Sequence, residues 1–333
     1  MTAVVTGASG HLGVNLIRSL LADGIEVRAL VHRNRAPLRG LDVEIVAGDV
    51  TDPGALVAAF EGAEVVYHLA GVIVLGRDRG GAMRRVNVDG AAAAAHAAHR
   101  AAVGRFVLRS SIHSFDLGCD GGTVDESSPR VPPHSARHAP YDRSKADGER
   151  RVREEIALGL DGVIVHPTSV IGPWDFEPSR MGRVFLGMFE RTLPALVDGS
   201  FDFVDVRDVA AGMRLAAERG AVGESYLLSG HRASVGDLAA LAAKITGARP
   251  PRITIPNRAA ALCAPLIEAF AGMAGSEPIY TRASIGILRN PPTVSRSKAT
   301  RDLGYSVRSL EETIGDVYAW FAAGGRIEWV PDE

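Results

Sequence analysis

The segment YDRSK (141–145) is the part of this chain whose residue types and spacing first suggest chemistry. Side chains at positions i and i+4 of a helix share one face, so a helix here brings the phenol of Tyr141 next to the ammonium of Lys145. A phenol has a pKa of about 10, and a nearby positive charge favours its ionised form. The spacing indicates an acid–base pair, although surface helices use the same pattern for a lysine lying over an aromatic ring.

A glycine-rich motif, TGASGHLG (6–13), lies between an apolar run and a segment with helical apolar spacing. Its glycines are Gly7, Gly10 and Gly13. Glycines at these positions permit a tight turn and close approach of the backbone to a ligand. The amides of His11 and Leu12 would then lie at a helix N-terminus, which favours a pyrophosphate. A tight turn without a ligand uses similar residues, so the prediction depends on the position between strand and helix.

The end of the next predicted strand bears on which dinucleotide would bind. An acidic residue there binds the ribose 2′-hydroxyl, whereas an arginine accommodates a 2′-phosphate. His32, Arg33 and Arg35 occupy this position, and no acidic residue stands between Glu26 and Asp42. The sequence therefore favours NADP(H), while NAD(H) stays open because residues just past a strand often face water.

Two further strand ends are expected to contact the cofactor, because doubly wound sheets bind ligands at the carboxyl ends of their strands. In GDV (48–50), an acid suited to the adenine amino group is followed by a small apolar residue. In HLAG (68–71), small residues let the backbone pass close to a cofactor. The residues expected to contact the cofactor are Asp49, Val50, Leu69, Ala70 and Gly71.

Alternating β-rich and helical segments predict the architecture that positions these residues. The β-rich runs are 3–7, 26–31, 43–48, 64–71, 105–111 and 162–167. Helical patterns lie between them, at 12–23 and 90–102 among others, and Thr51-Asp52-Pro53 resembles a capped helix start. This alternation predicts an α/β fold with a Rossmann-type doubly wound parallel sheet. Two later runs, 201–206 and 225–230, are expected to return to the same sheet.

Beyond residue 172, proline and glycine become frequent, which predicts a smaller C-terminal substrate lobe. We expect residues 1–171 plus 201–230 to form the nucleotide-binding domain and residues 172–200 plus 231–308 to form the lobe. Residues 309–325 are expected to form a C-terminal helix with Ser309 and Glu312 as its capping box and a stop at Gly324.

Composition limits the class of protein. The 333 residues are 46% hydrophobic and 23% charged, with a net charge of −2, which fits a folded α/β chain and disfavours a nucleic-acid partner. No segment is apolar for long enough to predict a membrane span. Cys119 and Cys263 are too few for a disulfide framework, so we expect a reducing compartment and a cytoplasmic location.

The chain resembles the extended short-chain dehydrogenase/reductase family, also called the NAD-dependent epimerase/dehydratase family, and its dihydroflavonol-reductase-like branch in particular. The resemblance covers nearly the whole length, in the order TGASGHLG, GDVTD, HLAG, VNVDG, Ser110-Ser111, YDRSK, HPTSVIGP and FVDVRDVA. It implies that Ser111, in preference to its neighbour, forms the catalytic set with Tyr141 and Lys145. It also implies that Lys145 bonds the nicotinamide ribose and that Pro167 lies against the nicotinamide.

One departure from the family pattern bears on the reaction. Family dehydratases carry an Asp-Glu pair after the catalytic serine or threonine, whereas this chain has Ile112 and His113, which disfavours dehydration. His113 is either a substrate contact or a structural residue, the second being commoner for a histidine just past a strand. Asn87 in VNVDG is expected to support the site through backbone contacts.

Three functions follow from these observations. The first is an NADP(H)-dependent oxidoreductase that acts on a small, rather apolar alcohol, ketone or aldehyde. The second is an NAD-dependent nucleotide-sugar epimerase, and the third is a non-catalytic cofactor-sensing protein, which the intact YDRSK disfavours. The resemblance also suggests a homodimer through helices at 90–102 and 141–158.

The apolar segments of the lobe allow two interpretations. They are either ordinary core or the wall of a pocket for an apolar substrate, and core is commoner for such stripes. The residues concerned are 258–274, 283–288, Trp174, Phe176 and Met188.

A metal site is disfavoured. His134 and His138 have metal-ligand spacing for a helix, but neighbouring prolines predict a loop there.

Overall fold

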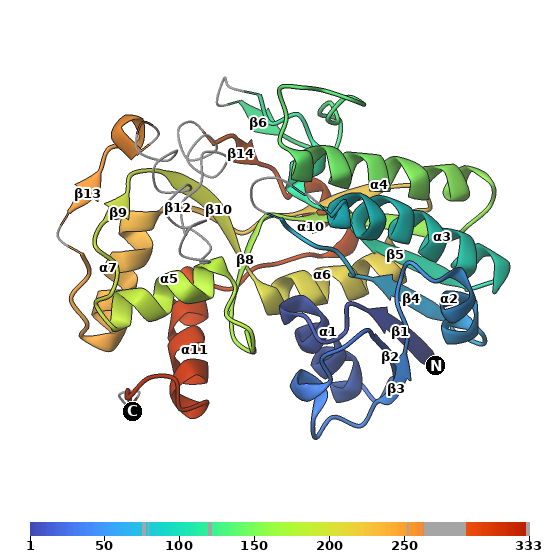
Figure 1. The fold of residues 1–333 in the computed structure, drawn as a ribbon, viewed down its shortest axis with the longest axis horizontal. Coiled ribbons are helices and arrows are strands. Elements are labelled where there is room, and N and C mark those ends of the chain that lie inside the picture. The colour runs from blue at the N-terminus through green and yellow to red at the C-terminus, as the bar shows by residue number, and fades with distance from the viewer. Residues whose placement is uncertain are drawn as a thin grey trace.

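The structure is a computed structural model that describes residues 1–74, 78, 80–118, 122–251, 253–260, 262 and 291–330. A seven-stranded sheet with the order β11-β7-β5-β4-β1-β2-β3 forms its centre (Figure 1). Every neighbouring pair in this sheet is parallel. Its strands are β1 (Thr2–Thr6), β2 (Glu26–Val31), β3 (Glu44–Ala47), β4 (Val65–His68), β5 (Arg105–Arg109), β7 (Gly162–Pro167) and β11 (Ser225–Leu228). The predicted doubly wound parallel sheet is confirmed.

Helices cover both faces of this sheet. Alternate residues of β1 face opposite layers: Ala3 and Val5 pack in one hydrophobic cluster, whereas Val4 packs in the other. On the first face α1 packs against α6, and on the second α3 packs against both α2 and α4. These helices are α1 (His11–Ala22), α2 (Pro53–Phe60), α3 (Ala91–Arg100), α4 (Pro140–Ala157) and α6 (Val206–Arg219).

Local signals account for several helix boundaries. Asp52 caps α2 by accepting hydrogen bonds from the amides of Gly54 and Ala55, and Pro53 occupies the first helical position. Ser309 caps α11 (Leu310–Ala323) by accepting from the amide of Glu312, and the helix ends at Gly324. The predicted helix 90–102 is α3, which follows a π-helical segment at Arg84–Gly90.

A second hydrophobic core lies beside the main sheet, and we call it the second core. It contains the buried faces of α5 (Arg180–Phe189), α7 (Val235–Thr246) and α11, which stand together on the left of Figure 1. A three-stranded sheet of β8 (Ser169–Ile171), β10 (Ser200–Asp205) and β12 (His231–Ser234) adjoins these helices. The prediction that residues 201–206 return to the main sheet is wrong, because β10 pairs with β8 and β12 instead. Residues 225–230 do return, as β11.

The remaining elements are short. Two pairs of two-residue strands link distant segments: β9 (Leu196–Val197) with β13 (Thr254–Ile255), and β6 (Thr123–Val124) with β14 (Thr293–Val294). The helix α10 (Ser297–Leu303) packs against α6. Most of the predicted apolar segment 258–274, all of 283–288, and both cysteines lie outside the described residues. No helix among the described residues is long and apolar enough to cross a membrane.

Candidate active site

The glycine turn joins β1 to α1 and leaves no room for a side chain at Gly7 or Gly13. Gly7 has a φ of +66°, and a Cβ there would stand 2.8 Å from the Ala70 nitrogen. A Cβ on Gly13 would stand 2.3 Å from the Gly7 carbonyl oxygen, which also accepts the Gly10 amide at 3.1 Å. Because Gly10 has no side chain with which to cap α1, the first-turn amides of His11 and Leu12 lack a capping side chain. This turn fits a dinucleotide pyrophosphate.

The turn after β4 lies directly against the glycine turn and is held from three directions. Thr6 Oγ1 accepts the Ala70 amide at 3.2 Å, and Arg109 Nη2 donates to the Leu69 carbonyl at 2.8 Å. Asn87 accepts the Val72 amide at 2.8 Å and donates to the Val72 carbonyl at 2.9 Å. Asn87 therefore supports this turn through backbone contacts, as the sequence indicates.

The ends of β2 and β3 meet through a contact between His32 and Asp49. His32 Nε2 lies 3.3 Å from Asp49 Oδ2, and Asp49 Oδ1 accepts from the amide and hydroxyl of Thr51 at 2.9 Å each. The Thr51 amide, followed by its hydroxyl and the neighbouring His32 and Arg33, holds the pKa of Asp49 below its usual range despite partial burial. Arg33 and Arg35 are exposed beside this pair.

Tyr141 and Lys145 lie on the first turns of α4, whose start is secured by the Ala139 amide donating to Asp142 Oδ2 at 3.1 Å. Lys145 is 6% exposed, and its Nζ donates to the Arg109 carbonyl at 3.2 Å, so the ammonium group reaches the end of β5. Burial and then Arg109 lower the pKa of Lys145 well below its ordinary value, while the charge of Glu149 opposes them.

The two serines after β5 have different surroundings. Ser110 is 1% exposed and donates to Glu149 Oε2 at 3.0 Å, so its hydroxyl hydrogen is committed. Ser111 Oγ accepts the His113 amide at 3.2 Å, which leaves its own hydrogen available to donate. This geometry favours Ser111 as the hydroxyl that faces a substrate. Pro167 ends β7, two strands from β4, and is buried there.

His113 contacts the first turn of α4, where Tyr141 lies. Its ring stands edge-on to the Tyr141 ring, with centroids 5.5 Å apart and an interplanar angle of 65°. Its Nδ1 is 2.9 Å from Asp142 Oδ1. In the sequence, the one sign of this contact is Asp142, an acidic residue directly after Tyr141 that can pair with a histidine.

The loop after β8 contacts α1 rather than forming an apolar wall. His11 Nε2 and Asn15 Nδ2 both bond the Pro173 carbonyl, at 3.0 and 3.1 Å. The Trp174 ring lies under the Arg18 guanidinium at 3.4 Å and contacts Trp320 at a centroid distance of 4.5 Å.

The other two aromatic or thioether candidates also have packing roles. Phe176 packs on Trp320 with centroids 4.9 Å apart, and Met188 is 2% exposed inside the second core. Ordinary packing therefore accounts for these residues and for Trp174.

The histidines at 134 and 138 do not share a helical face. The segment before α4 forms turns, in which His138 bonds Ser135 Oγ at 2.7 Å and Asp116 Oδ1 at 3.2 Å. No group of three metal-ligating side chains occurs among the residues described above.

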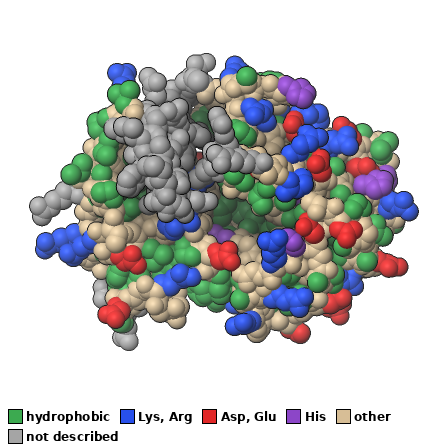
Figure 2. Space-filling view, viewed as in Figure 1, with side chains coloured by type: hydrophobic (Ala, Val, Ile, Leu, Met, Phe, Trp, Pro, Cys, Tyr) green, Lys and Arg blue, Asp and Glu red, His purple; other side chains and the backbone are tan. Residues whose placement is uncertain are grey.

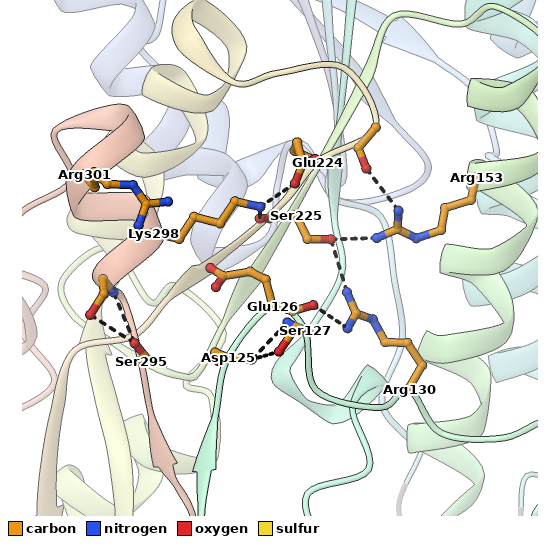
Figure 3. Close-up of a pocket in the computed structure, with 12 residues that line it drawn as sticks. Asp125, Glu126, Ser127, Arg130, Arg153, Glu224, Ser225, Ser295, Lys298 and Arg301 are labelled. Carbon is orange, nitrogen blue, oxygen red and sulfur yellow. Dashed lines mark hydrogen bonds and ion pairs between the residues drawn. The ribbon is translucent and has the colours of Figure 1, made fainter.

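A polar cleft of about 570 Å³ lies away from this site, between the loop before Arg130, α4, the start of β11 and α10 (Figure 3). Its cations are already paired. Arg130 and Arg153 both pair with Glu149 and donate to Ser225 Oγ, and Lys298 pairs with Glu224. Arg301 pairs with Asp302. This compensation disfavours the cleft as a site for a charged ligand, despite its size.

Relatives of known name resemble the chain over nearly its whole length. Sterol demethylase protein B of Methylococcus capsulatus is 37% identical over 335 residues, covering 98% of this chain and 100% of the relative. A relative from Synechocystis sp. named after dihydroflavonol 4-reductase is 32% identical, covering 97% and 95%. The ceramide reductase of Caulobacter vibrioides is 31% identical, covering 98% and 95%.

Solved structures share the fold. The crystal structure of gox2253 superposes with a TM-score of 0.85 at 32% identity, covering 98% of this chain and 99% of that one. MoeE5 in complex with UDP-glucose and NAD gives a TM-score of 0.77 at 24% identity, covering 97% and 99%. At that identity the likeness concerns the fold alone.

The sequence model of the NAD dependent epimerase/dehydratase family matches residues 3–229. This span includes the glycine turn and the Tyr141–Lys145 pair. The chain is therefore an oxidoreductase of the NAD-dependent epimerase/dehydratase family, within the extended short-chain dehydrogenases/reductases.

Proposed function

We propose that this protein is an NADP(H)-dependent oxidoreductase that interconverts an apolar alcohol with its ketone or aldehyde, with Tyr141 as general acid and base. The observation that carries the proposal is the placement of Lys145. Its Nζ reaches the Arg109 carbonyl, two residues before Ser111, while Tyr141 lies one turn earlier on α4. We infer that phenol, ammonium and hydroxyl act together at the carboxyl end of β5, which neighbours the strand whose end lies against Gly7.

A bound nicotinamide would exchange a hydride with the carbonyl carbon of the substrate. Tyr141 would donate its phenolic proton to the carbonyl oxygen during reduction and recover it during oxidation. Ser111 would donate a hydrogen bond to the same oxygen, where negative charge develops. Lys145 would favour the phenolate form of Tyr141 by its charge and would hold the cofactor ribose.

The cofactor would lie along the carboxyl ends of the strands. Its pyrophosphate would bind the amides of the glycine turn, Asp49 and Val50 would contact the adenine, and Leu69 to Gly71 and Pro167 would pass close to the rest of it. The exposed side chain of Arg33 and the neighbouring His32 support NADP(H) as the preferred cofactor, because both can face a 2′-phosphate.

The substrate class is supported by the relatives. The names of two of them, sterol demethylase protein B and ceramide reductase, refer to large apolar molecules. We therefore extend the expected substrates from small apolar carbonyl compounds to lipid-like ones. A chain with only two cysteines fits a reducing compartment, and a cytoplasmic location is part of this proposal. A homodimer through α3 and α4 is part of this proposal.

Nucleotide-sugar epimerisation is the second candidate, favoured by the match to the sequence model of the epimerase/dehydratase family. A cofactor-sensing protein without turnover is the third, and the intact Tyr141 and Lys145 argue against it.

The deciding experiment incubates the purified protein with NADPH or NADH and panels of aliphatic ketones, sterol ketones and UDP-sugars, and follows cofactor absorbance. We expect consumption of NADPH with the apolar ketones. Tightly bound NAD together with sugar conversion and no net cofactor consumption would establish the epimerase instead. Cofactor binding without turnover on any panel would favour the sensing protein.

A further inference from the structure

Glu149 has a buried carboxylate that no step of the reaction uses. It is 3% exposed. Its Oε2 accepts from Ser110 Oγ at 3.0 Å and from His166 Nε2 at 2.8 Å. Its Oε1 accepts from Arg130 Nε at 2.9 Å and from Arg153 Nη2 at 3.0 Å. One side chain of α4 therefore binds groups from β5, β7 and the loop before α4.

Two of these neighbours, Ser110 and His166, adjoin a candidate site residue. Ser110 precedes Ser111, and His166 precedes Pro167. Side chains alternate along an extended chain, so a bond that directs Ser110 toward Glu149 leaves Ser111 directed away from it. Ser111 has an extended backbone, with φ −162° and ψ 154°. Glu149 also lies one turn after Lys145 on the same face of α4.

The charges around Glu149 keep the carboxylate ionised. Burial alone would raise the pKa of Glu149, but His166, Arg130 and Arg153 outweigh it and hold the pKa well below the ordinary value. Burial lowers the pKa of His166, while the charge of Glu149 and its hydrogen bond oppose this effect, and His166 Nε2 donates its hydrogen to the carboxylate. Within the described part of the chain, His166 Nδ1 is buried without a hydrogen-bond partner.

The two arginines also anchor the edge of the main sheet. Arg130 Nη2 and Arg153 Nη2 donate to Ser225 Oγ at 3.2 and 2.6 Å, where β11 begins (Figure 3). Arg153 Nη1 donates to the Gly223 carbonyl at 3.0 Å. Arg130 and Arg153 therefore connect two places: they line the polar cleft, and through Glu149 they are linked to Ser110 and His166.

We propose that Glu149 is a positioning residue: its carboxylate holds the ends of β5 and β7 against α4 and thereby places Ser111, Pro167 and Lys145 relative to one another. The inference rests on the proposed function. It assigns to Arg130 and Arg153 the role of retaining the ionised carboxylate in the core. Removing one partner of a buried ion pair is strongly destabilising, because the other charge stays buried without compensation. We therefore expect this network to hold the strand ends in place.

The test replaces Glu149 by glutamine, which keeps the shape of the side chain and removes its charge. We expect Glu149→Gln to lower kcat for NADPH-linked ketone reduction at least tenfold, because a small displacement of reacting groups reduces turnover strongly. The Kd for NADPH, measured by fluorescence titration, should change less than threefold. The matched control is Asp208→Asn. Asp208 is also a buried carboxylate, 5% exposed, and it bonds the Arg308 side chain from α6. This control should leave kcat unchanged.

A second readout does not need turnover. The Ser110 amide donates to the Val165 carbonyl at 2.8 Å, between the two strand ends in question. In Glu149→Gln, hydrogen exchange at this amide should accelerate at least tenfold relative to wild type, whereas Asp208→Asn should leave it unchanged. If the wild-type protein shows no NAD(P)H-linked turnover, the proposed function fails while this readout still decides the positioning role.

Two results would overturn the inference. One is a Glu149→Gln protein with wild-type kcat and wild-type exchange at Ser110. The other is an equal loss of kcat in Glu149→Gln and Asp208→Asn, which would indicate general destabilisation. Should Glu149→Gln fail to fold, Ser110→Ala decides, because it removes one hydrogen bond and leaves the ion pairs. We expect a kcat about threefold to tenfold lower, and an unchanged kcat would refute the role.

Discussion

At the scale of single residues, Tyr141 differs from the buried tyrosines of this chain. Tyr67, Tyr226, Tyr305 and Tyr318 are almost fully buried, and burial raises the pKa of Tyr67, Tyr305 and Tyr318. Tyr141 is only partly buried, at the start of α4, with His113 on one side and Lys145 one turn away. A tyrosine in this setting is partly exposed and shares a helix face with Lys145.

Removing the Tyr141 hydroxyl should abolish the proton transfer while leaving the cofactor site intact. We expect Tyr141→Phe to lower kcat by about 10²- to 10⁴-fold, the usual contribution of a general acid or base, with an unchanged Kd for NADPH. Steady-state kinetics and fluorescence titration measure the two quantities. Tyr226→Phe is the control, since its hydroxyl accepts the Ala221 amide at 3.2 Å on the edge strand. Near wild-type turnover in Tyr141→Phe would refute the assigned role.

Lys145 is expected to serve both binding and chemistry. Lys145→Met keeps the length and apolar stem of the side chain but removes the group that bonds the Arg109 carbonyl. We expect a weaker Kd for NADPH together with at least a tenfold lower kcat, because the lysine charge acts on Tyr141 and on the cofactor ribose. A variant that loses only free energy of unfolding, with kcat and Kd intact, would show that the lysine is structural.

At the scale of elements, the turn between β1 and α1 depends on close backbone packing. A Cβ on Gly13 would lie 2.3 Å from the Gly7 carbonyl oxygen, which cannot move without opening the turn. We expect Gly13→Ala to raise the Kd for NADPH at least tenfold and to destabilise the fold by about 1–3 kcal/mol, the usual cost of overpacking.

Gly315→Ala in α11 is the matched control for this substitution. A Cβ there meets nothing within 4 Å. Because alanine has the higher helix propensity, this change should stabilise the protein by up to about 1 kcal/mol. Urea unfolding and NADPH titration of both variants provide the measurements. Equal NADPH affinity in Gly13→Ala and wild type would contradict the assignment of the turn to the cofactor.

At the scale of the whole molecule, buried ionisable groups predict sensitivity to acid. His68 is 1% exposed, and burial, then Lys145 and Arg109, lower its pKa to about 3. Between its unfolded pKa of about 6.5 and that folded value, the unfolded chain binds a proton that the folded chain excludes. Stability therefore falls as the pH falls through this window, by about 1.4 kcal/mol per pH unit from this group. The lowered pKa of Glu149 acts in the same direction below about pH 4.3.

The variant His68→Asn tests this dependence. Urea unfolding between about pH 6 and 4.5 should show a slope of stability against pH that is smaller by about 1.4 kcal/mol per unit than in wild type. An identical slope in both proteins would mean that His68 does not titrate on unfolding in this range.

Charged groups are arranged to balance over the molecule. Acidic and basic side chains are interspersed on the face shown in Figure 2, over the helices of the main sheet. Two buried carboxylates are paired with arginines, Asp208 with Arg308 and Asp205 with Arg207. This pattern agrees with a net charge of −2 and with a small-molecule partner.

The sequence alone determined the features that depend on neighbouring residues. The bounds of β2 and β7 agree with the predicted runs 26–31 and 162–167. Short apolar runs between turn residues favour a buried strand. The glycine turn and the Asp52 and Ser309 caps are local as well. The division into 1–171 plus 201–230 and 172–200 plus 231–308 stays a prediction, as do the catalytic and cofactor residues.

Tertiary structure decided the features that depend on residues far apart in the chain. The sequence predicts a strand at β10, but not that the strand pairs with β8 and β12 beside the second core instead of joining the main sheet. Ser110 and Ser111 are identical in type, and their hydroxyl groups have different partners, the carboxylate of Glu149, 39 positions away, for Ser110 and the His113 amide for Ser111. His113 acquires its neighbours from α4. Local patterns specify which backbone conformation a segment favours, whereas hydrogen bonds and ion pairs between distant segments specify what each side chain faces.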